Sequence, residues 1–353
     1  MRIVSVGSAF PDQYYSQTEI AAALKAEWGD ILPSIEVMER LHTRVGVDGR
    51  YLAAPLEQYS QIRRWGQAND LWIKVATELG EKAITHAMAA AQLPLERVSA
   101  MLTVSVTGIA SPSLDARLMN AMPRLPRELR RTPIFGLGCV AGAAGLTQAA
   151  DYVRAFPDRV AVLLSVELCS LTWQRGDTSI ANLIASGLFG DGAAAVVVAG
   201  ANVVVPETRG PRILASQSSF YPHTQDTMGW TVSESGFTLV LSPDVPQIIR
   251  KFLPGDVDRF LSAHALGKKD IGSYVFHTGG PKVLQAMMDA LELPEGSCDA
   301  SWQNLREVGN LSSTSVLLVL KDVMENRRPE PGTLGLIAAM GPGFCSELLL
   351  VEW

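Results

Sequence analysis

The sequence predicts an α/β protein made of two similar halves, each a succession of βαβαβ-type units. Short apolar runs, which are typical of buried strands, alternate along the chain with helical patterns. A reactive or polar residue occupies a turn of this order around Cys139, and again around His277 and Asn310. We therefore expect a half over residues 1–200 that carries the cysteine, and a half over residues 201–353 that carries the histidine and the asparagine.

Composition and charge are those of an ordinary globular chain. Of the 353 residues, 47% are hydrophobic and 19% are charged, and the formal net charge is -6. No long run of lysine or arginine is present, so we expect no nucleic-acid partner. The first residues lack the apolar core of a signal peptide, and no apolar run approaches the length of a membrane-spanning helix. We expect a cytoplasmic protein without a membrane span.

The cysteines are scattered, without a Cys-x-x-Cys pair or histidines at ligand spacing; they are Cys139, Cys169, Cys298 and Cys345. This pattern argues against a disulfide framework and against a structural metal site. It is typical of a reducing compartment, and we expect no bound metal.

The N-terminal half reads as strands and helices in alternation. Apolar runs predict buried strands over residues 3–7, 100–106, 132–135, 160–167 and 193–198. The run at 160–167 is almost continuously apolar, as expected for a strand covered on both faces. Helical patterns open near Thr18 and then cover residues 36–45, 71–93, 143–156 and 180–186.

The C-terminal half begins with a mixed segment over about residues 200–270, in which six prolines separate short strands and a helix. A strand at 274–277 then leads through a glycine turn to a helix at 282–291, with Pro281 suited to its first turn. The order closes with an apolar helix at 315–324 and strands at 334–339 and 347–351.

Cys139 lies between glycines at the junction of a predicted strand and an alanine-rich helix. The free N–H groups and the dipole at a helix N-terminus favour an anion, so we expect the pKa of this thiol to be lowered. A thiolate is the form that attacks a carbonyl carbon. The alternative is that Cys139 is simply a small buried apolar residue.

Two further groups allow either a structural or a functional interpretation. Arg40, Arg44 and Arg50 fall within eleven residues, as a solvated helix face and loop or as a clamp for an anion such as a phosphate. Glu167 ends an apolar strand, where a carboxylate needs hydrogen-bond partners. It is either a structural anchor or part of the floor of a site.

His277 and Asn310 could complete a site for acyl transfer with the cysteine. Sulfur would carry the acyl group, while imidazole and carboxamide N–H groups would bind a developing enolate or oxyanion. Asparagine cannot act as a proton-transfer base at neutral pH, so its use would be to donate a hydrogen bond to negative charge.

Several motifs in order give the sequence a resemblance to the type III polyketide synthases, the chalcone synthase-like branch of the thiolase fold, over essentially its full length. The matching motifs are Gly138-Cys139-Val140-Ala141-Gly142, Val166-Glu167, Leu188-Phe189-Gly190-Asp191-Gly192, His277-Thr278-Gly279-Gly280-Pro281, Gly309-Asn310-Leu311-Ser312-Ser313 and Gly341-Pro342-Gly343. The resemblance implies a five-layered αβαβα thiolase-like fold and a homodimer. It implies coenzyme A thioesters as substrates, with no cofactor.

In such enzymes the cysteine takes a starter acyl group from an acyl-CoA. Carried over by motif, His277 would stabilise the Cys139 thiolate, and with Asn310 it would hold the malonyl-CoA thioester carbonyl during loss of carbon dioxide. Phe189 would shape the junction between the CoA tunnel and the cavity. Thr172 and Ser312 are cavity candidates by motif position, and Arg44 and Arg50 stand where the family places cations that meet CoA phosphates.

The sequence departs from the plant pattern at positions that bear on the substrate. Leu239 stands where phenylalanine is usual, and Ser111 stands where the plant enzymes place a methionine that reaches toward the partner subunit. These changes resemble bacterial members that make alkylpyrones or alkylresorcinols from fatty acyl starters. We therefore expect an iterative decarboxylative condensation that accepts a long-chain fatty acyl starter, followed by cyclisation to an alkylpyrone or alkylresorcinol-type product.

Three alternatives stay open at this point. A ketoacyl synthase III-like enzyme would perform one condensation, but that group normally follows its histidine with Gln-Ala-Asn, whereas His277 is followed by Thr278-Gly279-Gly280-Pro281. A non-catalytic thiolase-fold protein would bind acyl-CoA and release no carbon dioxide. A cysteine hydrolase would make less use of the histidine and asparagine pair.

Overall fold

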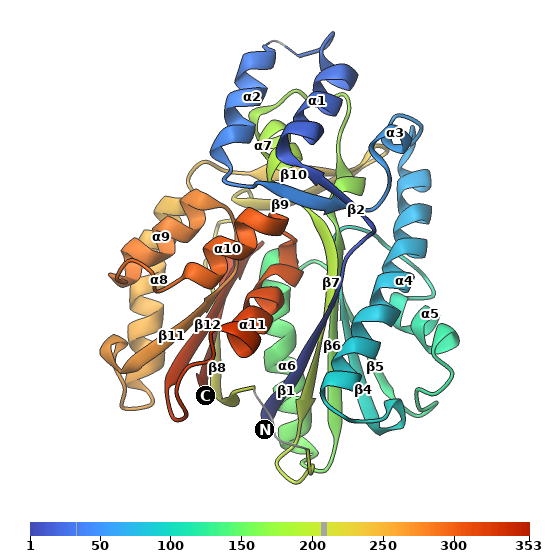
Figure 1. The fold of residues 1–353 in the computed structure, drawn as a ribbon. Helices are drawn as coiled ribbons and strands as arrows, with labels where there is room; N and C mark the ends of the chain where they lie inside the picture. The colour runs from blue at the N-terminus through green and yellow to red at the C-terminus, as the bar shows by residue number, and fades with distance from the viewer. Residues whose placement is uncertain (33, 206–209) are drawn as a thin grey trace.

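The computed structural model describes residues 1–32, 34–205 and 210–353. Its main element is a nine-stranded sheet with the order β11-β12-β13-β8-β1-β7-β6-β4-β5 (Figure 1). The strands are β1 (Arg2–Ala9), β4 (Val98–Val104), β5 (Arg130–Ile134), β6 (Val160–Leu168), β7 (Asp191–Ala199), β8 (Arg212–Phe220), β11 (Ile271–Phe276), β12 (Leu334–Gly341) and β13 (Cys345–Glu352).

The sheet divides into two parts with the same pairing pattern. In the first, β1 and β7 are antiparallel, β7 and β6 are antiparallel, and β6 and β4 are parallel. In the second, β8, β13, β12 and β11 repeat this sequence of pairings. A single residue pair, Arg2 with Arg212, connects the parts through β1 and β8. The expectation of two similar α/β halves is confirmed, and β5 is an addition to the first.

Helices fill the space between the two parts of the sheet and cover their outer faces (Figure 1). The central pair is α6 (Ala141–Ala155) and α11 (Ser315–Asn326). On the outer faces, α4 (Trp65–Ala90) and α5 (Leu114–Ala121) cover the first part, while α8 (Val245–Ser262) and α9 (Pro281–Leu291) cover the second. These layers are the expected αβαβα arrangement of a thiolase-like fold.

The side chains of β6 show why five layers form. Ala161 and Leu163 pack into the cluster around the central helices, whereas Val162 and Leu164 pack into the cluster that contains α4. Because alternate residues of a strand point to opposite faces, a strand that is apolar throughout must be covered on both. The near-continuous apolar run of this strand therefore required helices on each side.

The remaining elements surround the end of the molecule where the strands β5 and β11 terminate (Figure 1). They are α1 (Gln17–Trp28), α2 (Ile35–Arg44), α3 (Leu56–Tyr59), α7 (Ile180–Leu188), α10 (Asp299–Val308), the hairpin of β9 (Met228–Ser233) with β10 (Gly236–Leu241), and the pair β2 (Gln13–Ser16) with β3 (Gly49–Leu52). Pro222 separates β8 from this hairpin, and Pro243 separates the hairpin from α8. Pro246 and Pro254 lie within α8, and Pro206 lies outside the described residues.

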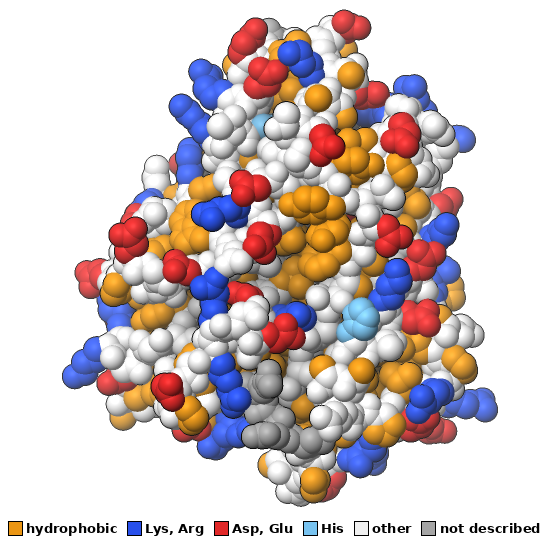
Figure 2. All heavy atoms as spheres, viewed as in Figure 1, with side chains coloured by type: hydrophobic (Ala, Val, Ile, Leu, Met, Phe, Trp, Pro, Cys, Tyr) orange, Lys and Arg blue, Asp and Glu red, His pale blue; other side chains and the backbone are white. Residues whose placement is uncertain are grey.

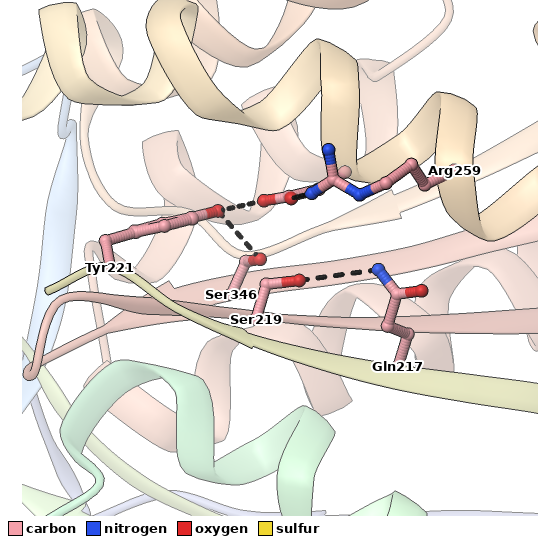
Figure 3. Close-up of polar contacts among 6 residues, drawn as sticks. Gln217, Ser219, Tyr221, Arg259 and Ser346 are labelled. Atoms are coloured by element: carbon pink, nitrogen blue, oxygen red, sulfur yellow. Dashed lines mark hydrogen bonds and ion pairs between the residues drawn. The ribbon is translucent and has the colours of Figure 1, made fainter.

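A buried polar cluster attaches α8 to the sheet beside the Gly341–Gly343 turn (Figure 3). Tyr221 donates to Asp256 at 2.6 Å and lies 2.9 Å from the hydroxyl of Ser346, and Arg259 also pairs with Asp256. The backbone N–H of Tyr221 donates to the carbonyl of Phe344 at 2.9 Å. This bond connects the cluster to the turn that closes one side of the pocket described below.

Two boundaries differ from the sequence-based expectation. The strand expected to be buried before Cys139 is β5, and residues 130–133 of it are exposed. The reason is its position, because β5 ends the sheet and pairs with β4 alone in the described part of the chain. The helix expected over residues 71–93 is α4, which begins six residues earlier and ends at Ala90.

Acidic and basic side chains are interspersed on the face drawn in Figure 2, without a region of one sign. Within the three described ranges, no helix combines the length and the apolar character needed to cross a bilayer. In the same ranges no three histidine, cysteine or carboxylate side chains converge as a metal site would require.

Candidate active site

Cys139 lies where the chain leaves β5 and enters the central helix α6. It is in a single 3-10 turn, Gly138–Val140, directly before Ala141. Gly138 has a φ of 52°, and a Cβ there would lie 2.7 Å from the ring of Pro342, so this position requires glycine. The thiol is 8% exposed, and its Sγ lies 3.5 Å from the hydroxyl of Ser312. The turn thus holds the sulfur at the pocket wall.

Burial sets the protonation of the thiol and of the imidazole. It raises the pKa of Cys139 to about 12, with the nearby Glu167 adding to the effect and the contact with Ser312 opposing it. Burial also lowers the pKa of His277 to about 4. The expectation of a lowered cysteine pKa is therefore wrong, because loss of solvation outweighs the helix N-terminus. Charge on the sulfur requires a compensating charge close by.

His277 follows β11 directly, at the start of the glycine turn that leads to α9. Its backbone N–H donates to the carbonyl of Ala338 at 3.0 Å, which continues the pairing of β11 with β12 by one residue. Gly280 ends the turn with a φ of 121°. The Nδ1 atom of His277 is buried and has no hydrogen-bond partner among the described residues. The ring is oriented by packing.

Asn310 is fixed by a short parallel bridge to Phe189. Its N–H donates to the carbonyl of Leu188 at 2.9 Å, and its carbonyl accepts from the N–H of Gly190 at 3.0 Å. The side-chain Oδ1 accepts from the N–H of Ser312 at 2.7 Å. The carboxamide therefore has its oxygen engaged, and its NH₂ group is the donor it presents.

These three side chains line one pocket whose empty volume, counting the part open to solvent, is about 680 Å³. The structure thus brings together Cys139, His277 and Asn310 from two halves of the chain. Most of the remaining wall is apolar or aromatic, and its largest members are Phe189, Met228, Trp230, Leu239, Leu241, Met340 and Phe344. Such a cavity, apolar with a few convergent polar groups, is typical of a small-molecule site.

Other residues singled out in the sequence are divided between the pocket and the surface. Phe189, Leu239 and Ser312 line the pocket, and Thr172 lines a smaller cavity that adjoins it. Thr172 donates its hydroxyl hydrogen to the carbonyl of Cys169 at 2.7 Å. Ser111 is exposed and does not line the pocket of its own chain, so its part in making room for a long chain stays a prediction.

The two arginines expected at the CoA phosphates have opposite environments. Arg44 is exposed in the last turn of α2. Arg50 is 0% exposed, and its guanidinium donates to the carbonyls of Ser186 and Gly187. The expectation that Arg50 meets a phosphate is corrected, because its charge is enclosed and two of its donors are committed to the end of α7. Asp191 is its nearby counter-charge and favours the charged form of the guanidinium.

Glu167 lies behind the pocket wall at the end of β6. One oxygen accepts from the N–H of Val106 at 3.1 Å and from the hydroxyl of Thr107 at 2.9 Å, with Ser105 at 3.3 Å. The other accepts from Ser313. Burial raises the pKa of this carboxyl and these donors lower it. Glu167 is thus a hydrogen-bond anchor that ties the strand ends of the first half to the Ser312–Thr314 turn.

The pocket also contains residues that no motif indicated. Met228 and Trp230 come from the β9–β10 hairpin, and Cys169 follows β6. The hairpin belongs to the proline-rich segment, where the sequence predicted only short strands and a helix. The aromatic and β-branched residues Trp230, Thr231 and Val232 are a sequence signal of a strand, but they do not reveal which cavity the strand covers.

Comparison with known proteins agrees with this geometry. Residues 1–202 match the N-terminal domain of chalcone and stilbene synthases, and residues 212–352 match the C-terminal domain. The chain belongs to this family. As a type III polyketide synthase it is an acyltransferase that uses coenzyme A thioesters, acyl-CoA and malonyl-CoA, so the alternatives of a ketoacyl synthase III-like enzyme and of a non-catalytic binding protein are not supported.

Among its relatives, the chain is 48% identical to a 1,3,6,8-tetrahydroxynaphthalene synthase of Streptomyces peucetius subsp. caesius, over 99% of this chain and 93% of the relative. It is 29% identical to a phloroglucinol synthase of Pseudomonas fluorescens, over 98% of this chain and 97% of that one. The crystal structure of the 1,3,6,8-tetrahydroxynaphthalene synthase of Streptomyces coelicolor A3(2) superposes with a TM-score of 0.93 at 29% identity, covering 100% of this chain and 99% of that one.

Proposed function

We propose that this type III polyketide synthase condenses malonyl units into a small polyhydroxylated aromatic of the 1,3,6,8-tetrahydroxynaphthalene type. The observation that carries the proposal is the 48% identity over nearly the whole chain to an enzyme with that product name. The product has ten ring carbons, which five malonyl units supply once each has lost carbon dioxide. The enclosed pocket, with bulky side chains on most sides, suits a compact product.

In this proposal Cys139 is the nucleophile and His277 is its base. Proton transfer from Sγ to the imidazole creates thiolate and imidazolium together, so the pocket gains no net charge. The thiolate attacks the thioester carbonyl of the starter, the bond from that carbon to the CoA sulfur breaks, and CoA leaves as the thiol after taking a proton. Burial disfavours a thiolate alone and an imidazolium alone, since it raises the pKa of Cys139 and lowers the pKa of His277.

Asn310 and His277 then serve the extending malonyl-CoA. The Asn310 NH₂ group donates to the thioester oxygen as carbon dioxide leaves, which stabilises the enolate that forms there. The enolate carbon attacks the acyl group on Cys139, the carbon–sulfur bond breaks, and the thiolate is regenerated for another round. Removing a donor of this kind typically costs about 3 to 4 kcal/mol of transition-state stabilisation.

The halves divide this work. Residues 1–200 supply the nucleophile, and residues 201–353 supply the histidine and the asparagine. Phe189 and Leu239 bound the cavity, and Arg44 is the cation proposed to meet a CoA phosphate because it is exposed, unlike Arg50. If so, Arg44→Ala raises the KM for malonyl-CoA and leaves kcat unchanged.

A fatty acyl starter leading to an alkylpyrone or alkylresorcinol is the second candidate. The observation that favours it is the apolar wall of the pocket together with the smaller cavity beyond Phe189, Trp230 and Leu239. The two candidates differ in what primes Cys139, which is malonyl-CoA alone in the first and a long-chain acyl-CoA in the second.

One incubation series decides between these candidates. Purified protein is given malonyl-CoA alone, or with acyl-CoA starters from acetyl to stearoyl, and the products are identified by mass spectrometry beside Cys139→Ala. We expect a ten-carbon aromatic from malonyl-CoA alone, absent in the variant. Alkylpyrones or alkylresorcinols formed only with a long starter would replace the first candidate by the second. A single-extension product would contradict both.

We also propose that the protein is a homodimer joined through the β5 edge of the sheet. β5 is the last strand of the sheet, the exposed Phe135 directly follows it, and the exposed Ile109 lies in the segment after the neighbouring strand β4. Edge strands with unpaired N–H and C=O groups tend to be covered, and a two-fold contact between copies does so.

A further inference from the structure

Three cavities follow one another inward from the surface beside α1 and α3. The catalytic pocket and the smaller cavity share Cys169, Phe189, Trp230 and Leu239 as walls. The smaller cavity, whose empty volume is about 260 Å³, has one wall in common with an outer cavity of about 580 Å³. That shared wall is Trp173. A route from Cys139 to the surface beside α1 is therefore divided at this indole.

Trp173 is held in place by packing. It directly follows the 3-10 turn Cys169–Thr172, and its ring centroid lies 5.0 Å from that of Tyr59 with the planes tilted by 36°. Its Nε1 atom is buried and has no hydrogen-bond partner within the described residues. The next residue, Gln174, fixes the backbone by donating to the carbonyls of Ser235 and Phe237. A change of the indole alone should therefore open the wall and leave the segment in place.

The outer cavity has the character of a site for an alkyl chain. Leu24, Trp28 and Leu56 contribute apolar walls. Its polar groups have partners: Arg175 pairs with Glu27 at 2.6 Å, and the hydroxyls of Tyr59 and Ser170 bond to each other. The remaining hydroxyl, of Ser60, donates to the carbonyl of Glu57. A cavity with apolar walls and partnered polar groups would accept methylene groups without leaving a donor or acceptor newly unpaired.

We infer that Trp173 is the residue that limits the length of the acyl chain on Cys139, and that the cavity behind it receives a longer chain when the indole is removed. This inference rests on the proposed polyketide chemistry of Cys139. It makes Trp173 a specificity-determining residue that excludes long starters from the native enzyme. It also accounts for a short-chain enzyme whose pocket wall is otherwise apolar.

The test measures loading of Cys139, which precedes every later step. Native protein and Trp173→Ala are incubated with an equimolar mixture of hexanoyl-CoA and palmitoyl-CoA, and the acyl adducts on Cys139 are quantified by intact-protein mass spectrometry. We expect the palmitoyl-to-hexanoyl ratio to rise by on the order of 10-fold or more in the variant, because a few extra buried methylenes give discrimination of this size. Trp173→Leu is measured in parallel, in case the alanine variant does not fold.

Matched variants distinguish loss of the Trp173 wall between the two cavities from a general loosening of the structure. Ile62→Ala enlarges the outer cavity and keeps the Trp173 indole, so its ratio should equal the native one. Adding Ala23→Phe to Trp173→Ala fills the outer cavity from α1 and should return the ratio toward native. An unchanged ratio in the folded Trp173 variants, or a gain that survives Ala23→Phe, would overturn the inference. The identity of the malonyl-only product is read from the unmodified enzyme, so a different product there would contradict the proposed function and leave this result interpretable.

Discussion

The protonation states of Cys139 and His277 are both set by burial in the same pocket. Burial raises the pKa of the thiol to about 12 and lowers that of the imidazole to about 4, so each alone is neutral near pH 7. A thiolate becomes accessible when the proton moves to a base within the same pocket. The reactivity of the sulfur should therefore depend on the imidazole more than on the helix N-terminus.

This dependence can be measured directly by alkylation. In His277→Ala the thiol keeps its raised pKa and loses its base, so we expect the rate at which iodoacetamide alkylates Cys139 at pH 7 to fall by roughly 100-fold. The rate in the variant should continue to rise with pH beyond 9, because the thiol is then titrated by hydroxide alone. Mass spectrometry of the Cys139 peptide gives both rates. Equal rates at pH 7 in the native and variant proteins would show that the helix end activates the sulfur by itself.

At the scale of the elements, the site depends on how closely α6 approaches the turn that follows Asn310. A Cβ added at Gly142 would lie 2.1 Å from the carbonyl oxygen of Ser313 and 2.7 Å from Val316. Because Gly142 has no side chain, α6 can approach the Ser312–Thr314 turn closely enough for Cys139 to contact Ser312. Cores are packed densely enough that one added methyl must move backbone here.

Gly142→Ala should accordingly destabilise the protein and misplace the nucleophile. We expect a loss of about 1 to 3 kcal/mol in the free energy of unfolding, which is typical of overpacking, measured by denaturant titration. Product formation should fall as well, because the sulfur moves relative to Asn310. Gly176→Ala is the matched control, since nothing lies within 4 Å of a Cβ there. A Gly142→Ala variant as stable and active as that control would contradict this account.

At the scale of the whole molecule, the nine-stranded sheet has an open edge at β5. Arg131 on this strand pairs with the buried Asp115 of α5 at 3.2 Å, so the edge strand is tied to that helix. Phe135 and Ile109 are 53% and 42% exposed beside it. An edge with apolar neighbours is the part of the described surface best suited to a second copy of the chain.

Light scattering on the purified protein tests the dimer. We expect a mass of twice the 38.0 kDa of one chain. Phe135→Asp combined with Ile109→Asp should shift the mass toward a single chain, because a dimer would bury four carboxylates that have no partner. Val204→Asp alters another exposed apolar residue and should leave the mass unchanged. A native protein that elutes as a single chain would refute the proposed interface.

The sequence by itself determined the alternation of strands and helices and the two halves, and it pointed to the three residues proposed as catalytic, which the structure places around one pocket. Those features are local, since a turn such as the one around Cys139 is recognised from its neighbouring residues. The order of the motifs along the chain then indicates the family. The apolar run of β6 also predicted cover on both faces. The position of Glu167 at the end of an apolar strand predicts that it needs hydrogen-bond partners, but the sequence does not name its donors from Val106 and Ser313.

Only the tertiary structure decided what surrounds each of these residues. Whether Arg50 meets solvent or two carbonyls depends on α7, which lies about 140 positions away in the chain. The edge position of β5, the placement of Trp230 in the pocket and the partition at Trp173 are likewise set by packing between distant segments. The pKa of Cys139 is also decided by the tertiary structure, because solvation depends on every atom around the sulfur. The sequence shows only the residues beside it in the chain.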